Sequence, residues 1–200
     1  MSKTHIAIGI ATTLTATQPQ SAEAFCIAVL GGSIGGVICD LDNQFSHASR
    51  DARLGSLLTM GIAAAVFLLD FRLHMDIGRA IFHLRTPRQW VGMAGFAGVC
   101  LLCICSAHRS FSHSLLALGL FCGALHLTGS PILFSFACGF LSHILLDVLN
   151  RRPVSILFPL SRGVCLDLFY ADGVANAVLG VLGLLAAIGA GLRCLLPLVS

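Results

Sequence analysis

The chain has 200 residues, of which 56% are hydrophobic and only 10% are charged, and its mean hydropathy is +0.91. Soluble domains carry about 25% charged residues, so this composition excludes an ordinary water-facing surface and predicts a membrane protein. The formal charge of +3 is small and the arginines are dispersed, which excludes a nucleic-acid-binding protein. The length favours one domain over residues 1–200.

Apolar runs along the chain predict an all-α fold, a polytopic helical bundle in the membrane. In chain order they cover residues 4–17, 22–39, 54–69, 90–107, 114–128, 131–149 and 174–192. Several are shorter than the roughly 20 residues that span a bilayer. We therefore expect several short or tilted helices. The polar sequences "TQPQS" around Pro19 and "TGSP" at 128–131 predict tight turns between neighbouring helices.

The first run has two interpretations. Lys3, the apolar stretch and the small-x-small sequence Ala22-Glu23-Ala24 are typical of a secretory signal peptide. Against this, threonines at positions 12, 13, 15 and 17 dilute the apolar stretch. These residues by themselves leave both a cleaved leader and a retained first helix open.

The sequence "GGSIGG" at 31–36 lies inside the second run. It lacks the Lys-Ser/Thr ending and the strand-to-helix setting of a phosphate-binding loop. Small residues within a membrane helix allow a neighbouring helix to approach closely. We therefore expect helix packing at this stretch.

The segment 70–89, "DFRLHMDIGRAIFHLRTPRQ", interleaves four arginines with apolar residues. This pattern predicts one interfacial amphipathic helix that lies on the membrane, with its arginines reaching lipid head groups. His74 and His83 are then expected to be solvated surface residues.

The cysteines are expected to pack rather than to bind metal. Seven of the nine lie in or beside apolar runs, where Cys behaves as a small hydrophobe. Cys100, Cys103 and Cys105 resemble a soft-metal motif, but burial in apolar surroundings opposes formation of the thiolate. The odd total also argues against a disulfide scaffold.

Tracing the predicted helices back and forth brings the uncommon polar residues to one membrane face. His5 begins the first helix, and the second returns to the same side before Asp40 and Asp42. The run 90–107 returns to this side before His108 and His113, and the run 131–149 returns to it with His143 and Asp147. The residues expected to converge are His5, Asp40, Asp42, His108, His113, His143 and Asp147.

The spacing of these residues indicates a divalent-metal site. His143 and Asp147 are four apart and therefore share a helix face, where an imidazole and a carboxylate can bind one cation. The carboxylates of Asp40 and Asp42 lie on the same side of the chain only if the turn after the second helix is extended. Alternatively, one binds metal and the other orients a histidine. A competing interpretation treats all these groups as hydrogen-bonding contacts between helices, but buried ionisable residues in membranes are costly and usually functional.

The same residues carry a resemblance to the YdjM family, whose members are bacterial inner-membrane proteins regarded as metal-dependent hydrolases. The stretches "THIAIG", "GGVICDLDNQ", "HRSFSHS" and "GFLSHILLDVLNRRPVSILFPLSR" follow the family's order from position 4 to about 165. The family motifs map onto His5 with Gly9, Asp40 and Asp42, His108-Arg109 with His113-Ser114, Ser142-His143 with Asp147, and Phe158-Pro159. The resemblance implies a multi-pass protein of the bacterial inner membrane.

The chain departs from the family pattern at a few positions. Cys39 stands in place of a proline, and Ser110 and Ser112 in place of glycine and threonine. None of these changes removes a candidate ligand, so they bear on loop shape and substrate fit. Because a cleaved leader would discard His5, the resemblance favours a retained first helix.

Hydrolysis is the reaction that these residues favour. A divalent ion held by His and Asp activates water, and mixed nitrogen and carboxylate ligands favour zinc or manganese, with one to three ions. We expect a phosphoester in a lipid head group as substrate, with Arg109 stabilising a phosphoryl oxygen and Asp40 or Asp42 acting as base if it is not a ligand. Membrane lipid is the expected partner.

Two other functions use the same residues. A cation or proton transporter could pass its ion along the buried His and Asp side chains, but its ligands would be spread through the depth of the membrane. A non-enzymatic scaffold would use them only to fix helix packing. The predicted site face carries only a slight excess of Lys and Arg, so the positive-inside rule weakly favours a cytoplasmic site.

Overall fold

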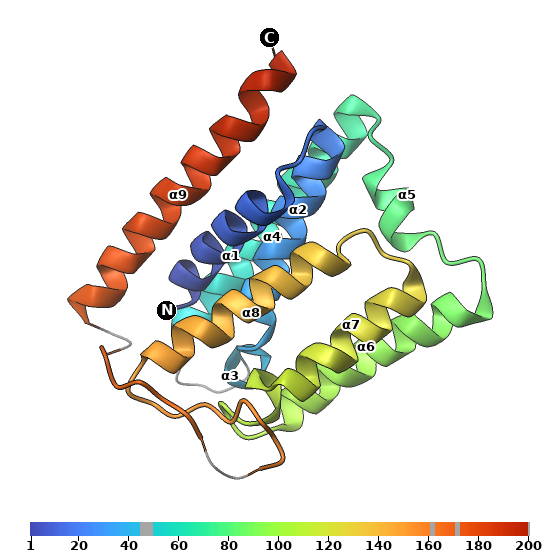
Figure 1. Ribbon diagram of the computed structural model, residues 1–200. Helices are drawn as coiled ribbons and strands as arrows, with labels where there is room; N and C mark the ends of the chain where they lie inside the picture. The colour runs from blue at the N-terminus through green and yellow to red at the C-terminus, as the bar shows by residue number, and fades with distance from the viewer. Residues whose placement is uncertain (45–49, 161–162, 171–172, 200) are drawn as a thin grey trace.

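The computed structural model describes residues 1–44, 50–160, 163–170 and 173–199, and it is helical apart from turns and one irregular segment. The helices are α1 (Ser2–Thr17), α2 (Ala22–Ile38), α3 (Leu41–Gln44), α4 (Arg50–Leu73), α5 (Ile77–Phe82), α6 (Pro87–Cys105), the 3₁₀ turn η1 (Phe111–His113), α7 (Leu115–Thr128), α8 (Leu133–Leu149) and α9 (Val174–Val199). Figure 1 shows the helices running back and forth between two ends of the molecule. All seven predicted apolar runs are helices, which confirms the all-α fold.

Local sequence sets where several helices begin and end. Ser21 caps α2 by accepting the backbone N–H of Ala24. Thr86 and Gln89 form a reciprocal capping box around Pro87, whose missing N–H costs nothing in the first turn of α6. Gly129 ends α7 in the left-handed conformation, at φ 69°. These boundaries give the short antiparallel connections that bring alternate helix ends together.

Three helices are long and apolar enough to cross a membrane within the described residues: Arg53–Leu73 of α4, Pro87–Cys105 (α6) and Val174–Leu196 of α9. The shorter apolar helices are α2, α7 and α8. The long helices expose large apolar side chains such as Leu57, Leu101 and Leu185. Helices α1, α2 and α8 pack against one another between α9 on one side and the α6–α7 pair on the other, and they form the interior of the bundle (Figure 1).

The segment 70–89 differs from the predicted amphipathic helix in being broken. Helix α4 continues to Leu73, His74 and Asp76 take positive φ, and only Ile77–Phe82 forms a separate helix before Pro87 begins α6. The break is stabilised because the carboxylate of Asp70 accepts the backbone N–H groups of Ile77 and Gly78. The four arginines are therefore divided among α4, α5, the following loop and α6 instead of lining one helix.

Glycines allow the interior helices to touch, as predicted for the stretch 31–36. A Cβ added to Gly9 of α1 would lie 2.6 Å from the carbonyl oxygen of Gly32 in α2, and one added to Gly36 would lie 2.8 Å from the carbonyl oxygen of His5. The same α2 surface meets Gly139 of α8. This packing places His5 of α1 beside α2 and α8. The described cysteines are free thiols, with Cys39 and Cys103 fully buried.

We expect Gly9→Ala to destabilise the protein by about 1–3 kcal/mol, because the new methyl group meets backbone that cannot move aside. The matched control is Gly123→Ala on α7, where a Cβ would meet nothing within 4 Å. That change should be neutral or stabilising by up to about 1 kcal/mol from helix propensity. Thermal unfolding in one detergent measures both. Equal melting temperatures for the two variants would contradict the close packing of α1 on α2.

Candidate metal centre

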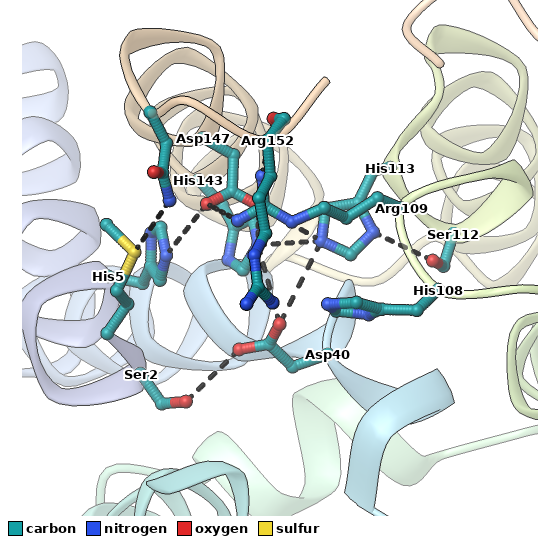
Figure 2. A network of polar contacts seen from close by, with 12 residues as sticks. Ser2, His5, Asp40, His108, Arg109, Ser112, His113, His143, Asp147 and Arg152 are labelled. Atoms are coloured by element: carbon teal, nitrogen blue, oxygen red, sulfur yellow. Dashed lines mark hydrogen bonds and ion pairs between the residues drawn. The ribbon is translucent and has the colours of Figure 1, made fainter. Parts of the chain in front are cut away.

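Several separate segments bring polar side chains to the end of the molecule where the N-terminus lies (Figure 1). His5 lies on the first turns of α1, Asp40 in the turn after α2, and Asp42 in α3. His108 and Arg109 follow α6, His113 ends η1, and His143 and Asp147 lie on the last turns of α8. Figure 2 shows the side chains of His5, Asp40, His108, Arg109, His113, His143 and Asp147 gathered from separate elements, and Asp42 contacts His108 and Ser112. The structure therefore brings together all the residues that the sequence singled out.

The inner part of the cluster contains two imidazoles and one carboxylate oxygen at short mutual distances. His113 Nε2 and His143 Nε2 are 3.2 Å apart. Asp147 Oδ2 lies 3.3 Å from the first nitrogen and 3.7 Å from the second. Ligands at about 2.0–2.2 Å from a tetrahedral ion lie about 3.3–3.6 Å from each other. These three atoms are spaced as three corners of such a site.

Two further side chains adjoin this triangle. Asp40 Oδ1 lies 3.8 Å from His143 Nε2 and 3.9 Å from His113 Nε2. His5 Nε2 lies 3.5 Å from Asp147 Oδ1, and its ring stacks on that of His143 with centroids 3.8 Å apart. Two groups of ligand atoms lie within 4.8 Å of one another: His5 with His143 and Asp147, and Asp40 with His113 and His143. The inner cluster therefore has five candidate ligands.

The hydrogen bonds of the two central imidazoles show which nitrogen is free. His143 Nδ1 lies 2.8 Å from the carbonyl oxygen of Gly36, which can only accept, so Nδ1 carries the hydrogen. Ser112 donates to Asp42 and therefore accepts from His113 Nδ1, at 2.8 Å. In the neutral rings, both Nε2 lone pairs then face each other and the carboxylates. This arrangement requires a cation between them, either a proton or a metal ion.

Asp42 and His108 form an outer pair rather than part of the inner cluster. Asp42 Oδ1 lies 2.9 Å from His108 Nδ1, and Oδ2 accepts from Ser112 Oγ at 2.5 Å. Asp42 thereby orients His108 directly and His113 through the serine. Of the two arrangements expected for Asp40 and Asp42, the geometry has the second, with one carboxylate at the cluster and the other orienting histidines.

Arg109 lies against a carboxylate of the cluster. Its Nη2 donates to Asp147 Oδ1 at 3.1 Å, and its Nη1 donates to the carbonyl oxygen of Arg152 at 2.7 Å. Its backbone takes φ 62°, a left-handed conformation that turns the side chain from the loop toward α8. Because Arg109 and His5 occupy Oδ1 of Asp147, Oδ2 remains for the centre of the cluster.

The cluster is enclosed on its inner side and open on its outer side. The side chains of His113 and His143 are fully buried, whereas that of His108 is 38% exposed. Burial raises the pKa of the Asp40 carboxyl, but positive charge on the imidazoles of His143, His5 and His113 lowers it more. The pKa therefore lies below its ordinary value, and Asp40 is a carboxylate at neutral pH.

The residues present fit a divalent ion of the zinc or manganese type. Their donors are imidazole nitrogens and carboxylate oxygens, a mixed set that suits these ions better than calcium. His5 Nδ1 is buried and has no hydrogen-bond partner among the described residues. Buried polar groups are rarely left without a partner, so His5 has hydrogen-bonding capacity that these residues do not fill.

The groups that orient the cluster could not be identified from sequence patterns. Ser112 stands out in the sequence only as a departure from the family pattern, although it links Asp42 to His113. Ser2 donates to Asp40 Oδ2 at 3.1 Å, and the carbonyl oxygen of Gly36 fixes His143. Serines and backbone carbonyls are so common in proteins that only the fold distinguishes these particular ones.

We expect Ser112→Ala to weaken metal binding by about 10–100-fold without abolishing it, because His113 loses the partner that fixes its tautomer. Ser110→Ala is the matched control, since the Ser110 hydroxyl contacts the carbonyl oxygen of Ala107 rather than a histidine. Competition with a chromogenic zinc chelator measures both affinities. An unchanged affinity in Ser112→Ala would contradict the orienting role.

The fold and the cluster together define a class: an all-helical membrane protein with a buried histidine–aspartate centre at one end of its helices. A family model described as YdjM inner membrane protein matches residues 1–196. The chain belongs to the YdjM family, as its motifs indicated. No curated protein and no solved structure gave a match.

Proposed function

We propose that the protein is a membrane-bound, metal-dependent hydrolase of the bacterial inner membrane that cleaves a phosphoester or related bond in a lipid-linked substrate. The observation that carries this proposal is the triangle of His113 Nε2, His143 Nε2 and Asp147 Oδ2, with sides of 3.2, 3.3 and 3.7 Å. Spacing of this kind supports a site for one zinc or manganese ion.

The ion would be held by His113, His143 and Asp147, and Asp40 or His5 would complete its ligands or hold a second ion. His143 has only Nε2 available, since Nδ1 is bonded to Gly36. A single ion bound through this nitrogen is therefore the simplest arrangement. Such an ion supplies an activated water and polarises the bond to be cleaved.

Asp40 and Arg109 adjoin the triangle, and we assign them the roles of general base and of contact to the phosphoryl group. Asp40 is ionised, partly accessible and held by Ser2 on the open side of the cluster, so it can accept a proton from an attacking water. Arg109 contacts Asp147 through Nη2, and its buried Nε has no hydrogen-bond partner within the described ranges. A phosphoryl oxygen at the cluster would give this guanidinium an additional acceptor.

A lipid-linked substrate is supported by the apolar surface around the site. The irregular segment after α8 passes over the cluster, where the carbonyl oxygen of Arg152 accepts from Arg109. It exposes several large apolar side chains at this end of the molecule, namely Leu157, Leu160, Leu166, Leu168 and Tyr170. Such side chains, with Arg151 and Arg152 beside them, suit the boundary between head groups and acyl chains.

An apolar groove begins at the same end. It has a volume of about 760 Å³ and lies between α1, α4 and α9, where Met1, Lys3, Ala7, Leu58, Val181 and Leu184 are among its lining residues. An acyl chain in this groove would place its polar end beside Met1 and Lys3. Ser2, which donates to Asp40, lies between these two residues.

The transporter function has less support, because the candidate ligands gather at helix ends on one side of the bundle (Figure 2). Hydrolysis is tested by incubating purified protein with a panel of bacterial phospholipids and lipid-linked phosphates, with zinc or manganese added. Mass spectrometry should detect a released phosphate-bearing head group or inorganic phosphate. Ion flux into protein-containing vesicles without any hydrolysis would favour the transporter instead.

A further inference from the structure

A second site lies at the opposite end of the bundle from the metal centre. A cavity of about 300 Å³ lies between α2, α4, α5, α6 and the turn from α7 to α8, with Phe67, Ile81, Phe82, Met93, Phe96 and Ser130 in its lining. We propose that this cavity binds one acyl chain of a phospholipid with an anionic head group. The proposal is independent of the hydrolase function.

The inner part of the cavity suits an acyl chain. Its deeper walls are formed by Leu30 and Ile34 of α2, Phe96 of α6 and Leu125 of α7, all of them apolar. Helix α5 covers it with the buried side chain of Ile81, and Asp70 holds the start of that helix in place. The walls provide no charged partner for a polar ligand.

The outer part of the cavity has a hydroxyl group without a partner. Ser130 is 8% exposed, and its Oγ makes no hydrogen bond to the part of the chain that the structure describes. It lies in the turn between α7 and α8, at the boundary end of the cavity, whereas the apolar walls lie deeper along the helices. The ester carbonyl of a phospholipid lies between its head group and its acyl chains, so it would accept from this hydroxyl while a chain fills the cavity.

The chain segment that includes the covering helix α5 is rich in arginine. Residues 70–89 contain Arg72, Arg79, Arg85 and Arg88 against two aspartates, Asp70 and Asp76. Asp70 is occupied by backbone N–H groups, and the Asp76–Arg79 pair is exposed and therefore weak. The cavity thus combines apolar walls and a hydroxyl group with arginines in the adjoining chain segment. These groups suit the acyl chain, the ester and the phosphate of an anionic phospholipid.

The test is a titration of the detergent-purified full chain with phosphatidylglycerol or phosphatidylcholine, with bound lipid counted by native mass spectrometry. The wild type should bind one phosphatidylglycerol more tightly than phosphatidylcholine. Ala63→Phe fills the cavity and should remove this preference, whereas Ala64→Phe, on the exposed side of α4, should retain it. The double variant Arg79→Gln/Arg88→Gln should lower the affinity for phosphatidylglycerol by about 25-fold, because each arginine contributes about fivefold.

Ser130→Ala provides a mild variant that does not depend on the folding of Ala63→Phe. It should lower phosphatidylglycerol affinity while leaving the melting temperature in detergent unchanged or higher, because the buried hydroxyl has no partner to lose. Equal binding of the two lipids by the wild type would overturn the proposal. So would an unchanged preference in both Ala63→Phe and Ser130→Ala, since that result would assign the lipid to the outer surface alone.

Discussion

Purified protein is expected to retain about one equivalent of zinc or manganese, and Asp147→Asn is expected to lose most of it. Asp147 Oδ2 is the one oxygen within 3.7 Å of both central imidazole nitrogens among the described contacts, and the amide of asparagine cannot replace its charge. The affinity should fall by at least about 100-fold, more than the loss typical of residues that only orient a ligand. His143→Ala should give the same result. Elemental analysis of size-exclusion fractions measures the metal.

His126→Ala is the matched control for the histidine variant, because His126 is exposed on α7 and distant in the chain from every candidate ligand. It should keep the full metal content. Asp147→Asn changes few atoms, so a melting temperature measured in parallel separates metal loss from unfolding. Full occupancy in a folded Asp147→Asn/His143→Ala protein would rule these residues out as ligands and leave the scaffold interpretation.

Hydrolysis by Asp40→Asn is expected to fall by about 10²–10⁴-fold, because the variant cannot accept a proton from water. Asp40 lies 3.8 Å or more from the central nitrogens, farther than Asp147, so the variant should retain most of its metal. Head-group release from the responsive lipid and metal content are measured on the same preparation. The two measurements together distinguish a base from a ligand.

Asp76→Asn is the control for this variant, since Asp76 is exposed at the other end of the bundle and pairs only with Arg79 among the contacts described. Its activity should equal that of the wild type. A folded Asp40→Asn protein with unchanged activity would contradict the role of Asp40. Loss of both metal and activity would make Asp40 a ligand instead.

The convergence of ionisable groups is costly, which limits the interpretations of the cluster. Five ionisable side chains meet at helix ends, and four of them, His5, His113, His143 and Asp147, are almost fully buried. Charges buried without compensation destabilise a protein by several kcal/mol, of the order of its whole stability. A scaffold gains little from such groups, since contacts between polar residues in membranes are worth only about 1 kcal/mol each. A bound cation would compensate the carboxylates directly.

The sequence alone determined the helices and the set of residues at the site. Apolar runs must be helical in a membrane because only a helix satisfies its own backbone hydrogen bonds there. Since the runs alternate in direction, the polar residues at their ends had to gather on one side. The i,i+4 spacing of His143 and Asp147 is sufficient by itself to place both side chains on one face of α8.

Only the tertiary structure decided how that set divides into an inner cluster and an outer pair. Asp40 and Asp42 are two residues apart, yet one faces the central imidazoles and the other His108, because the chain turns into α3 between them. The tautomer of His113 depends on Ser112, and the direction of Arg109 depends on a left-handed backbone conformation. The break in the segment 70–89 likewise depends on Asp70 reaching across to α5. Side-chain direction in turns is set by such contacts between distant segments, which periodicity and spacing do not encode.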